Sequence, residues 1–259
     1  MRTMLGAPFQ PAPGLLVLSA SKLRDFQSCR QRFHLAHVLG LRGDGDVDGL
    51  GTGPGLHVHA ELHARHAQPQ SHGPSHGPTH DGPDHSNEET PDDPAVNRAV
   101  RAHIELCPGD TAHYLGGEID LRWFAPGKAL LVTGRVDAMW RYPDGTLEVR
   151  DYKTGAVPDV LDNDPGALLY ALLAATQPAS AQPSGAPGPV RVVYERLGGE
   201  RPGIVSLDVT ADVLTRARRA VFDLADDIRR ERHFPASPHP ARCRMCPFIS
   251  TCPEGRSTL

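Results

Sequence analysis

Long hydrophobic runs are missing from this 259-residue chain, and aromatic residues make up only 5% of it. No stretch of eighteen apolar residues occurs, so no membrane-spanning helix is expected. Residues 1–13 also contain no long apolar stretch, which argues against a signal peptide and favours a cytoplasmic protein. The sequence has no Gly-x4-Gly-Lys-[Ser/Thr] loop for nucleotide phosphates, so any ATP-driven step would need another protein.

A strong positive charge is absent as well, because the formal net charge is −4. This value excludes an overtly basic nucleic-acid-binding domain, although local arginine clusters and bound metals can still contact phosphate. The arginines on the polar side of the helix expected at residues 211–232 are interpreted as a solvated charged face rather than a track for DNA.

Cysteine is scarce, and its placement does not suggest a disulfide framework. Three of the five cysteines, Cys243, Cys246 and Cys252, crowd together near the C-terminal end beside prolines. In a reducing compartment such spacing indicates metal binding, because the three sulfurs can surround one ion or cluster. A fourth ligand is needed, and the remaining candidates are Cys29 and Cys107.

The composition along the chain indicates a single domain with polar additions. Residues 1–14 are expected to be a mobile tail, and residues 15–259 are long enough to bury a core. Residues 68–94 repeat Ser-His-Gly-Pro and cannot bury a core, so they are expected to form a disordered insertion. Its histidines could bind transition metals adventitiously, although a solvated insertion is the preferred interpretation.

Hydrophobic periodicity and turn residues predict the elements that surround this insertion. The first helix should run from about Leu18 to Leu39, capped by Ser19 or Ser21, with Cys29 inside it. Further helices are expected at 56–67, 94–106, 165–176 and 211–232, and strands at 114–124, 129–142, 146–153, 190–196 and 204–209.

The central stretch, residues 131–155, is predicted to form a β-hairpin. Its Tyr-Pro-Asp-Gly-Thr sequence favours a type I turn followed by a glycine bulge, which gives a three-residue loop. That loop places Tyr142 opposite Thr146, and the same register places Asp137 opposite Asp151. A two-residue loop would shift the register by one and separate the two aspartates.

Asp137, Asp151 and Lys153 would therefore project on the same side of the hairpin. Two opposed carboxylates repel each other, and a divalent cation such as Mg²⁺ relieves that repulsion. The alternative is a solvated hairpin in which the acids pair with Arg135 and Lys153.

The strings Gly-Arg-Val-Asp at residues 134–137 and Asp-Tyr-Lys-Thr-Gly at residues 151–155 resemble the signature of PD-(D/E)xK nucleases, specifically the RecB-type branch. The resemblance implies an α/β fold of the restriction-endonuclease-like type, with a central mixed sheet flanked by helices. It also implies a metal-dependent DNA nuclease, with a single-strand exonuclease favoured, acting in DNA repair or recombination. The alternatives are a catalytically silent DNA-binding module with a structural metal cluster, or a zinc-bearing interaction protein.

By this resemblance, Asp137, Asp151 and Lys153 are the catalytic residues. Mg²⁺ or Mn²⁺ would be held by the two aspartates, the Tyr152 carbonyl and a histidine from an earlier helix. Relatives carry a helical Gly-x-x-x-His motif there, which fits either His57 or His59. Leu62 lies three residues after His59 and favours that frame, although a histidine on a surface helix is by itself more often solvated.

Two further positions are compared with the relatives. Tyr170 matches the tyrosine of a Gln-x-x-x-Tyr motif that holds DNA and the active site, but Gly166 stands where the relatives have glutamine. Tyr170 is therefore a candidate DNA contact, with core packing as the alternative. The segment after Cys29 matches a Cys-x-x-Arg-[Phe/Tyr] motif, with Arg30 in place of the usual proline.

One N-terminal cysteine combined with C-x2-C-x5-C resembles the iron–sulfur nucleases, namely AddB and the CRISPR-associated RecB-type exonucleases. The resemblance selects Cys29 over Cys107 as partner of Cys243, Cys246 and Cys252. It also implies a [4Fe–4S] cluster, with zinc as the alternative, in a C-terminal module at residues 240–255. The cluster would join the first helix to the C-terminal end. DNA is the implied partner, and a helicase or CRISPR-adaptation partner is left open.

Overall fold

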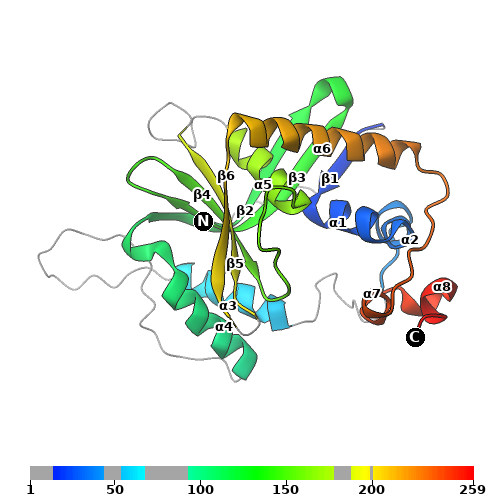
Figure 1. The fold of residues 1–259 in the computed structure, drawn as a ribbon, viewed down its shortest axis with the longest axis horizontal. Coiled ribbons are helices and arrows are strands. Elements are labelled where there is room, and N and C mark those ends of the chain that lie inside the picture. Colours follow the sequence, from blue (N-terminus) through cyan, green and yellow to red (C-terminus); the bar gives the residue numbers. More distant parts are fainter. Residues whose placement is uncertain (1–13, 44–53, 68–92, 178–187, 199–200) are drawn as a thin grey trace, which may run out of the picture.

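The computed structural model describes residues 14–43, 54–67, 93–177, 188–198 and 201–259 (Figure 1). The expected tail at 1–14 and the expected insertion at 68–94 lie outside the described residues except for Gly14, Asp93 and Pro94. The predicted end of that insertion at residue 94 is too late. Asp93 already caps helix α4 (Pro94–Leu106), because its side chain accepts a 2.7 Å hydrogen bond from the Ala95 N–H.

The described strands form one mixed sheet in the order β1-β3-β4-β5-β6, and β2 pairs with β3. Their bounds are β1 Leu16–Ser19, β2 His113–Ala125, β3 Leu130–Arg141, β4 Leu147–Lys153, β5 Val190–Arg196 and β6 Gly203–Asp208. One edge of β3 pairs with β2 from end to end. On the other edge, β1 pairs with residues 130–133 and β4 pairs with residues 138–141. In the described part of the chain, residues 134–137 have no strand beside them on that edge, which leaves a notch in the sheet.

Helices cover both faces of the sheet (Figure 1). The first core lies beneath α1 (Ala20–Ser28), α5 (Pro165–Ala175) and α6 (Ala211–Arg230), and the second lies beneath α3 (Pro54–Ala67) and α4. A mixed sheet flanked by helices agrees with the predicted fold class. Among the described helices, none is both long and apolar enough to cross a bilayer.

The prediction of one continuous helix over residues 18–39 is wrong in two places. Leu16–Ser19 is a strand parallel to β3, and the helix is interrupted at Cys29, which has extended dihedral angles of φ −160° and ψ 108°. After the break, α2 (Arg30–Phe33) leads into a π-helical turn at His34–Val38. Tertiary contact explains the break, because the Gln31 N–H donates to the Pro235 carbonyl at 3.3 Å instead of continuing the helix. The predicted Ser19 cap is confirmed, since its side chain accepts from the Lys22 N–H.

The hairpin has the predicted loop and register. Tyr142 and Thr146 close the turn with a 3.0 Å backbone bond, and Gly145 has φ +86°, a conformation that glycine adopts without strain. The strand pairs run from Arg141–Leu147 to Ala138–Arg150, as the three-residue loop requires. The ladder ends there, one pair short of Asp137 and Asp151, because β3 and β4 separate at the notch.

A buried ionic network lies under α4. The Arg150 guanidinium donates to Glu148 at 2.6 Å and to Glu195 at 2.5 Å, and all three side chains are at most 2% exposed. The guanidinium also donates a 2.9 Å hydrogen bond from Nη1 to the Leu106 carbonyl at the end of α4. The network therefore joins β4, β5 and α4 where water cannot screen the charges.

We expect Arg150→Met to lower the free energy of unfolding by about 3–5 kcal/mol, because two buried carboxylates lose their cation. Urea denaturation would measure the loss. Arg191→Met is the matched control, since Arg191 forms an exposed pair with Asp208 and should cost less than about 1 kcal/mol. Equal costs for the two variants would contradict a stabilising role for the buried pair.

Candidate active site

The notch in the sheet is closed by a tyrosine from α5. The Tyr170 hydroxyl lies 2.9 Å from the Arg135 carbonyl, which has no strand partner there, and 3.3 Å from the Asp151 carboxylate. Helix α5 can come this close because Gly134 has no side chain: a Cβ there would lie 2.7 Å from Leu173 Cδ1. Gly134 thus has a packing reason for its place in the Gly-Arg-Val-Asp string.

Asp137 lies at the notch and interacts with both sides of it. One carboxylate oxygen accepts a 2.5 Å hydrogen bond from the Tyr152 N–H of β4, and the other lies 3.2 Å from His59 Nδ1 of α3. The second ring nitrogen of His59 lies 2.9 Å from the Tyr152 carbonyl. Asp137, His59 and the Tyr152 carbonyl, predicted from the sequence as metal ligands, are therefore adjacent. His57 is exposed on α3, so His59 is the histidine that reaches this site.

Two acceptors on its two nitrogens favour the charged form of His59. Burial acts against that charge, but the hydrogen bond and the negative charge of Asp137 outweigh it, with help from the Tyr152 carbonyl, and the pKa of His59 is raised above 6.5. The ring lies between a carboxylate and a carbonyl, an arrangement that stabilises a positive charge at this position.

Asp151 and Lys153 form an ion pair next to this group. Burial raises the pKa of Asp151, the lysine counteracts that shift, and the neighbouring charge of Asp137 adds to it. The ammonium of Lys153 also lies 4.6 Å from the centre of the Tyr194 ring. Arg135 does not neutralise these acids, because its guanidinium pairs with Asp120 and Glu118 on β2.

Glu118 is a site residue that sequence reasoning missed. Its carboxylate and the ligand atoms of His59 and Asp137 all lie within 4.8 Å of one another. A register shift in β2 and a φ of +53° bring Glu118 to this position. Gly117 allows the close approach, because a Cβ there would lie 2.8 Å from the Asp137 carbonyl. The Gly-Gly pair inside a predicted strand was the available signal, since such glycines mark bulges.

An open groove of about 560 Å³ leads to these residues. Lys153 and Tyr170 line it together with the exposed side chains of Arg24 and Arg122. A neighbouring hollow shares Arg24 and Lys153 and continues towards Gly166. The groove therefore brings exposed cations together with the acidic residues, as a polyanion-binding surface requires.

Gly166 occupies the position where the relatives have glutamine, and the structure leaves no room for a larger residue. A Cβ at Gly166 would lie 2.6 Å from the Tyr194 hydroxyl. That hydroxyl donates a 2.6 Å hydrogen bond to Asp164, which caps α5. Tyr194 therefore fills the space beside the site that a longer side chain at 166 would otherwise enter.

The family model of the PD-(D/E)XK nuclease superfamily matches residues 17–253. The chain belongs to this superfamily. The search of curated proteins found no match.

Two solved structures resemble the chain more weakly. SSO0001 is 16% identical with a TM-score of 0.39, over 94% of this chain and 87% of that one. A protein titled "Putative exonuclease" from Eubacterium rectale is 12% identical with a TM-score of 0.44, over 83% of this chain and 80% of that one. These scores are too low to support an argument about function.

Membership of the PD-(D/E)XK nuclease superfamily supports a nuclease, and nucleases of this superfamily use divalent metals. The residues at the notch fit such an ion: two carboxylates, a backbone carbonyl and an imidazole are donors that magnesium and manganese accept. The site lies where β3 and β4 separate, so both strands and α3 position it.

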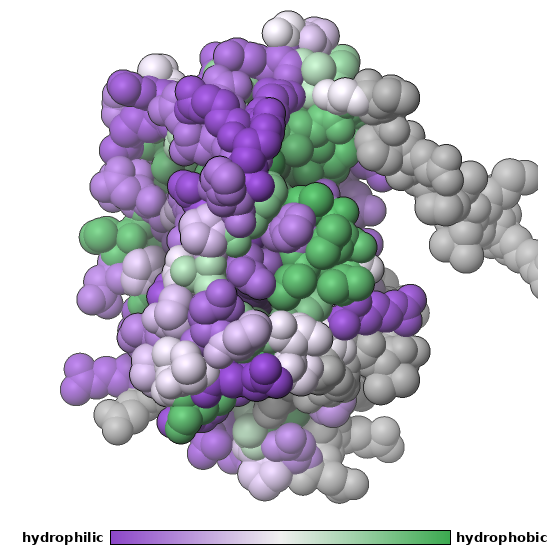
Figure 2. All heavy atoms as spheres, turned by 90° about the vertical axis from the view of Figure 1, so that its right-hand side faces the viewer, coloured by the Kyte–Doolittle hydropathy of each residue, from purple (hydrophilic) through white to green (hydrophobic). Residues whose placement is uncertain are grey.

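The four cysteines singled out by the sequence line one pocket of about 300 Å³. Cys29 lies at the break between α1 and α2, and the other three come from the segment containing α7 (Pro240–Arg244) and α8 (Pro253–Arg256). Arg242 joins this segment to the end of α1 by donating a 3.0 Å hydrogen bond to the Ser28 carbonyl. This end of the molecule, on the right of Figure 1, has a mixed hydrophilic and hydrophobic surface (Figure 2). Cys107 lies elsewhere, beside His66.

Proposed function

We propose that this chain is a Mg²⁺- or Mn²⁺-dependent deoxyribonuclease that acts preferentially as an exonuclease on single-stranded DNA. The observation that carries the proposal is the meeting of Asp137, His59 and the Tyr152 carbonyl beside the Asp151–Lys153 pair. Structural proteins rarely bury two acids, a lysine and a histidine around one open groove, because unpaired charges destabilise the fold.

The residues of the notch have distinct roles in this proposal. Asp137, His59 and the Tyr152 carbonyl hold the divalent ion, with Asp151 and Glu118 as further carboxylate ligands. When bound, the ion lowers the pKa of a water molecule and stabilises charge on the scissile phosphate. Lys153, fixed by Asp151 and the Tyr194 ring, orients the attacking water and favours its hydroxide form by its charge.

The groove supports nucleic acid as the substrate. Arg24 and Arg122 are exposed beside the acids, where they can pair with phosphates flanking the scissile bond. The groove is open rather than a closed pocket, which suits a strand passing through it. Tyr170 is buried and bonded to the sheet, so its part is to position Asp151 rather than to stack on a base.

The test is a panel of end-labelled single-stranded and duplex DNA substrates incubated with purified protein and Mn²⁺, Mg²⁺ or EDTA. We expect stepwise shortening of single-stranded substrate from one end, which EDTA abolishes. Binding without cleavage under all metal conditions would overturn the nuclease proposal. Internal cuts in circular single-stranded DNA would agree with the nuclease proposal but overturn the exonuclease preference.

The raised pKa of His59 predicts how metal binding depends on pH. The proton competes with the metal for the ring, so the affinity for Mn²⁺ should increase as pH rises above 6.5 through the raised folded pKa. The stability of the metal-free protein should change in the opposite direction and decrease as pH rises. The stabilisation by the charged His59 ring is complete below pH 6.5 and is lost as pH rises through the raised folded pKa. Calorimetric titration and thermal melts across this range measure both effects.

His59→Asn is the variant that separates this histidine from other titrating groups. Asparagine keeps a hydrogen-bonding side chain but does not titrate, so the pH dependence of both quantities should become shallower. His113→Asn, at an exposed position on β2, is the matched control and should behave as wild type. An unchanged slope in His59→Asn would show that another group governs the competition.

We also propose that the four-cysteine pocket holds a [4Fe–4S] cluster with a structural role. The support is that Cys29, which is far from the other three cysteines in the sequence, lines the same pocket as Cys243, Cys246 and Cys252. Four thiolates at one pocket are suitable ligands for a multi-iron cluster.

A further inference from the structure

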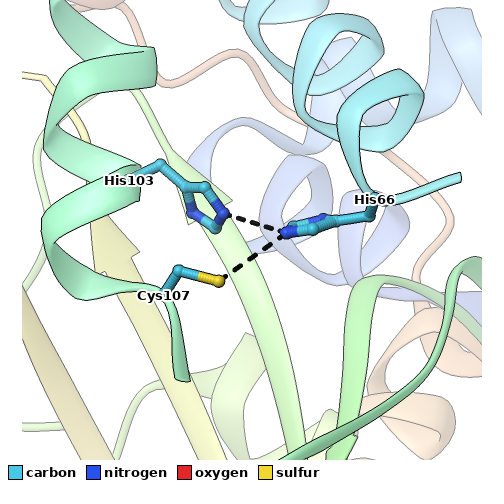
Figure 3. A group of neighbouring side chains, drawn as sticks. All are labelled: His66, His103 and Cys107. Carbon is cyan, nitrogen blue, oxygen red and sulfur yellow. Dashed lines mark hydrogen bonds between the residues drawn. The ribbon is translucent and has the colours of Figure 1, made fainter. Parts of the chain in front are cut away.

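A second group of metal-binding side chains lies in the core between α3 and α4, away from the groove (Figure 3). His66 comes from the last turn of α3, while His103 and Cys107 come from the end of α4. The two imidazole Nε2 atoms are 3.1 Å apart, and Cys107 Sγ is 3.8 Å from His66 Nε2. His103 is fully buried and His66 is 6% exposed.

The orientation of His103 is set by a buried carboxylate. Its Nδ1 lies 2.6 Å from Glu195, which also accepts from Arg150. The carboxylate fixes the proton on Nδ1, so the lone pair of Nε2 faces His66 and Cys107. A carboxylate behind a histidine is the arrangement that orients histidine ligands in zinc proteins and increases their basicity.

The distances within the group match those of a tetrahedral zinc centre. With bonds of about 2.0–2.1 Å to nitrogen and about 2.3 Å to sulfur, two nitrogens lie about 3.4 Å apart and a nitrogen and a sulfur about 3.6 Å apart. The observed separations of 3.1 Å and 3.8 Å are close to both values. Both separations are also hydrogen-bond distances, so the feature that points to a metal is the convergence of all three ligand atoms within 4.8 Å of one another.

We propose that His66, His103 and Cys107 form a structural Zn²⁺ site that is separate from the nuclease site and from the four-cysteine pocket. Two imidazoles and a thiolate select zinc over magnesium or manganese, which prefer oxygen ligands. The three residues leave one tetrahedral position for a water molecule. The rings of Tyr114 and Tyr152 lie next to His66 and His103, and their buried hydroxyls have no hydrogen-bond partner among the described residues.

The position of the site gives it a specific consequence. Residues 68–92 separate α3 from α4 in the sequence, and the metal would join the end of one helix to the end of the other. Two turns before His66, the same helix carries His59. A bound zinc would therefore fix the helix that supplies the histidine of the nuclease site.

The test uses chelator-treated full-length protein and Co²⁺ as a spectroscopic substitute for Zn²⁺. We expect Co²⁺ at this site to add a thiolate-to-cobalt charge-transfer band, which is measured as the difference between wild type and Cys107→Ser because the four-cysteine pocket also offers thiolates. Zn²⁺ should remove this difference by competition. Cys107→Ser should lose the part of the band that arises at this site, and His66→Asn should weaken Co²⁺ binding there at least tenfold. The control His113→Ala, at an exposed histidine of β2, should retain both. A band of equal intensity in wild type and Cys107→Ser would overturn the proposal.

A second measurement needs no variant and distinguishes this site from the other cysteines. Wild-type protein is alkylated with and without Zn²⁺, and the modified cysteines are located by mass spectrometry. Zn²⁺ should slow modification of Cys107 at least tenfold and leave the pattern at the four-cysteine pocket unchanged. Equal rates at Cys107 would overturn the zinc site. Neither readout uses DNA cleavage, so the result is independent of the proposed nuclease activity.

Discussion

Lys153→Ala is expected to reduce Mn²⁺-dependent DNA cleavage at least about a thousandfold, which corresponds to about 4 kcal/mol of activation free energy. The loss follows from the geometry, because Lys153 is the cation paired with Asp151 beside the ligands of the ion. DNA binding should persist, since the exposed arginines of the groove are unchanged. Single-turnover cleavage of an end-labelled strand measures the loss, and a binding assay in Ca²⁺ checks the retained affinity.

Asp137→Asn should reduce the rate of DNA cleavage by a comparable factor, because it weakens binding of the metal ion. The amide oxygen can still accept the Tyr152 N–H, so the strands stay joined, but the charge that attracts the ion is gone. The Mn²⁺ dependence should therefore weaken together with the rate. Lys128→Ala is a matched control for both variants, because Lys128 is an exposed lysine paired with Asp226. Activity within tenfold of wild type in Lys153→Ala and Asp137→Asn would refute the assignment.

Cys29→Ser is expected to have the largest effect on stability. Serine preserves the size of the side chain but removes one thiolate from the four-cysteine pocket, where the binding of a cluster contributes directly to folding. We expect a loss of more than about 5 kcal/mol, which lowers the melting temperature by about 10–20 °C for a domain of this size. Iron and sulfide analysis of anaerobically purified protein should show both elements in wild type and neither in the variant.

Ser28→Ala provides the control for this substitution. It changes the neighbouring side chain and leaves the backbone carbonyl that Arg242 contacts. Its iron content and melting temperature should remain close to those of wild type. Zinc without sulfide in the wild-type protein would contradict the iron–sulfur proposal, and full iron content in Cys29→Ser would exclude Cys29 as a ligand.

Local sequence was sufficient to predict those elements whose structure depends on one short segment. The Pro-Asp-Gly turn determined the hairpin register, and the helix predicted at residues 94–106 has those bounds in the structure. The short β1 strand could not be predicted in this way, because four residues gain their structure only from pairing with β3, more than a hundred residues later. Glu118 was missed for a related reason, since its position depends on a bulge and on the approach of Asp137 from the neighbouring strand.

The break at Cys29 could not be predicted either, because it depends on contacts between residues far apart in the sequence. A sequence of good helix formers surrounds it, and the extended conformation depends on contacts with residues 235 and 242 at the other end of the chain. The group of His66, His103 and Cys107 was also beyond sequence reasoning. Its members are separated by residues 68–92 and by most of α4, and only the packing of two helices brings them together.

The pocket that joins Ser28 and Cys29 to residues 240–256 has a consequence for synthesis of the protein. Arg242 and Ser28 are 214 positions apart, so residue 242 must be synthesised before the two can meet. Domains generally fold from the N-terminal side as they emerge, but here α1 and α2 wait for residues 240–256. A nascent polypeptide stalled before residue 240 should therefore leave α2 accessible to proteases, whereas a polypeptide extended beyond residue 256 protects it.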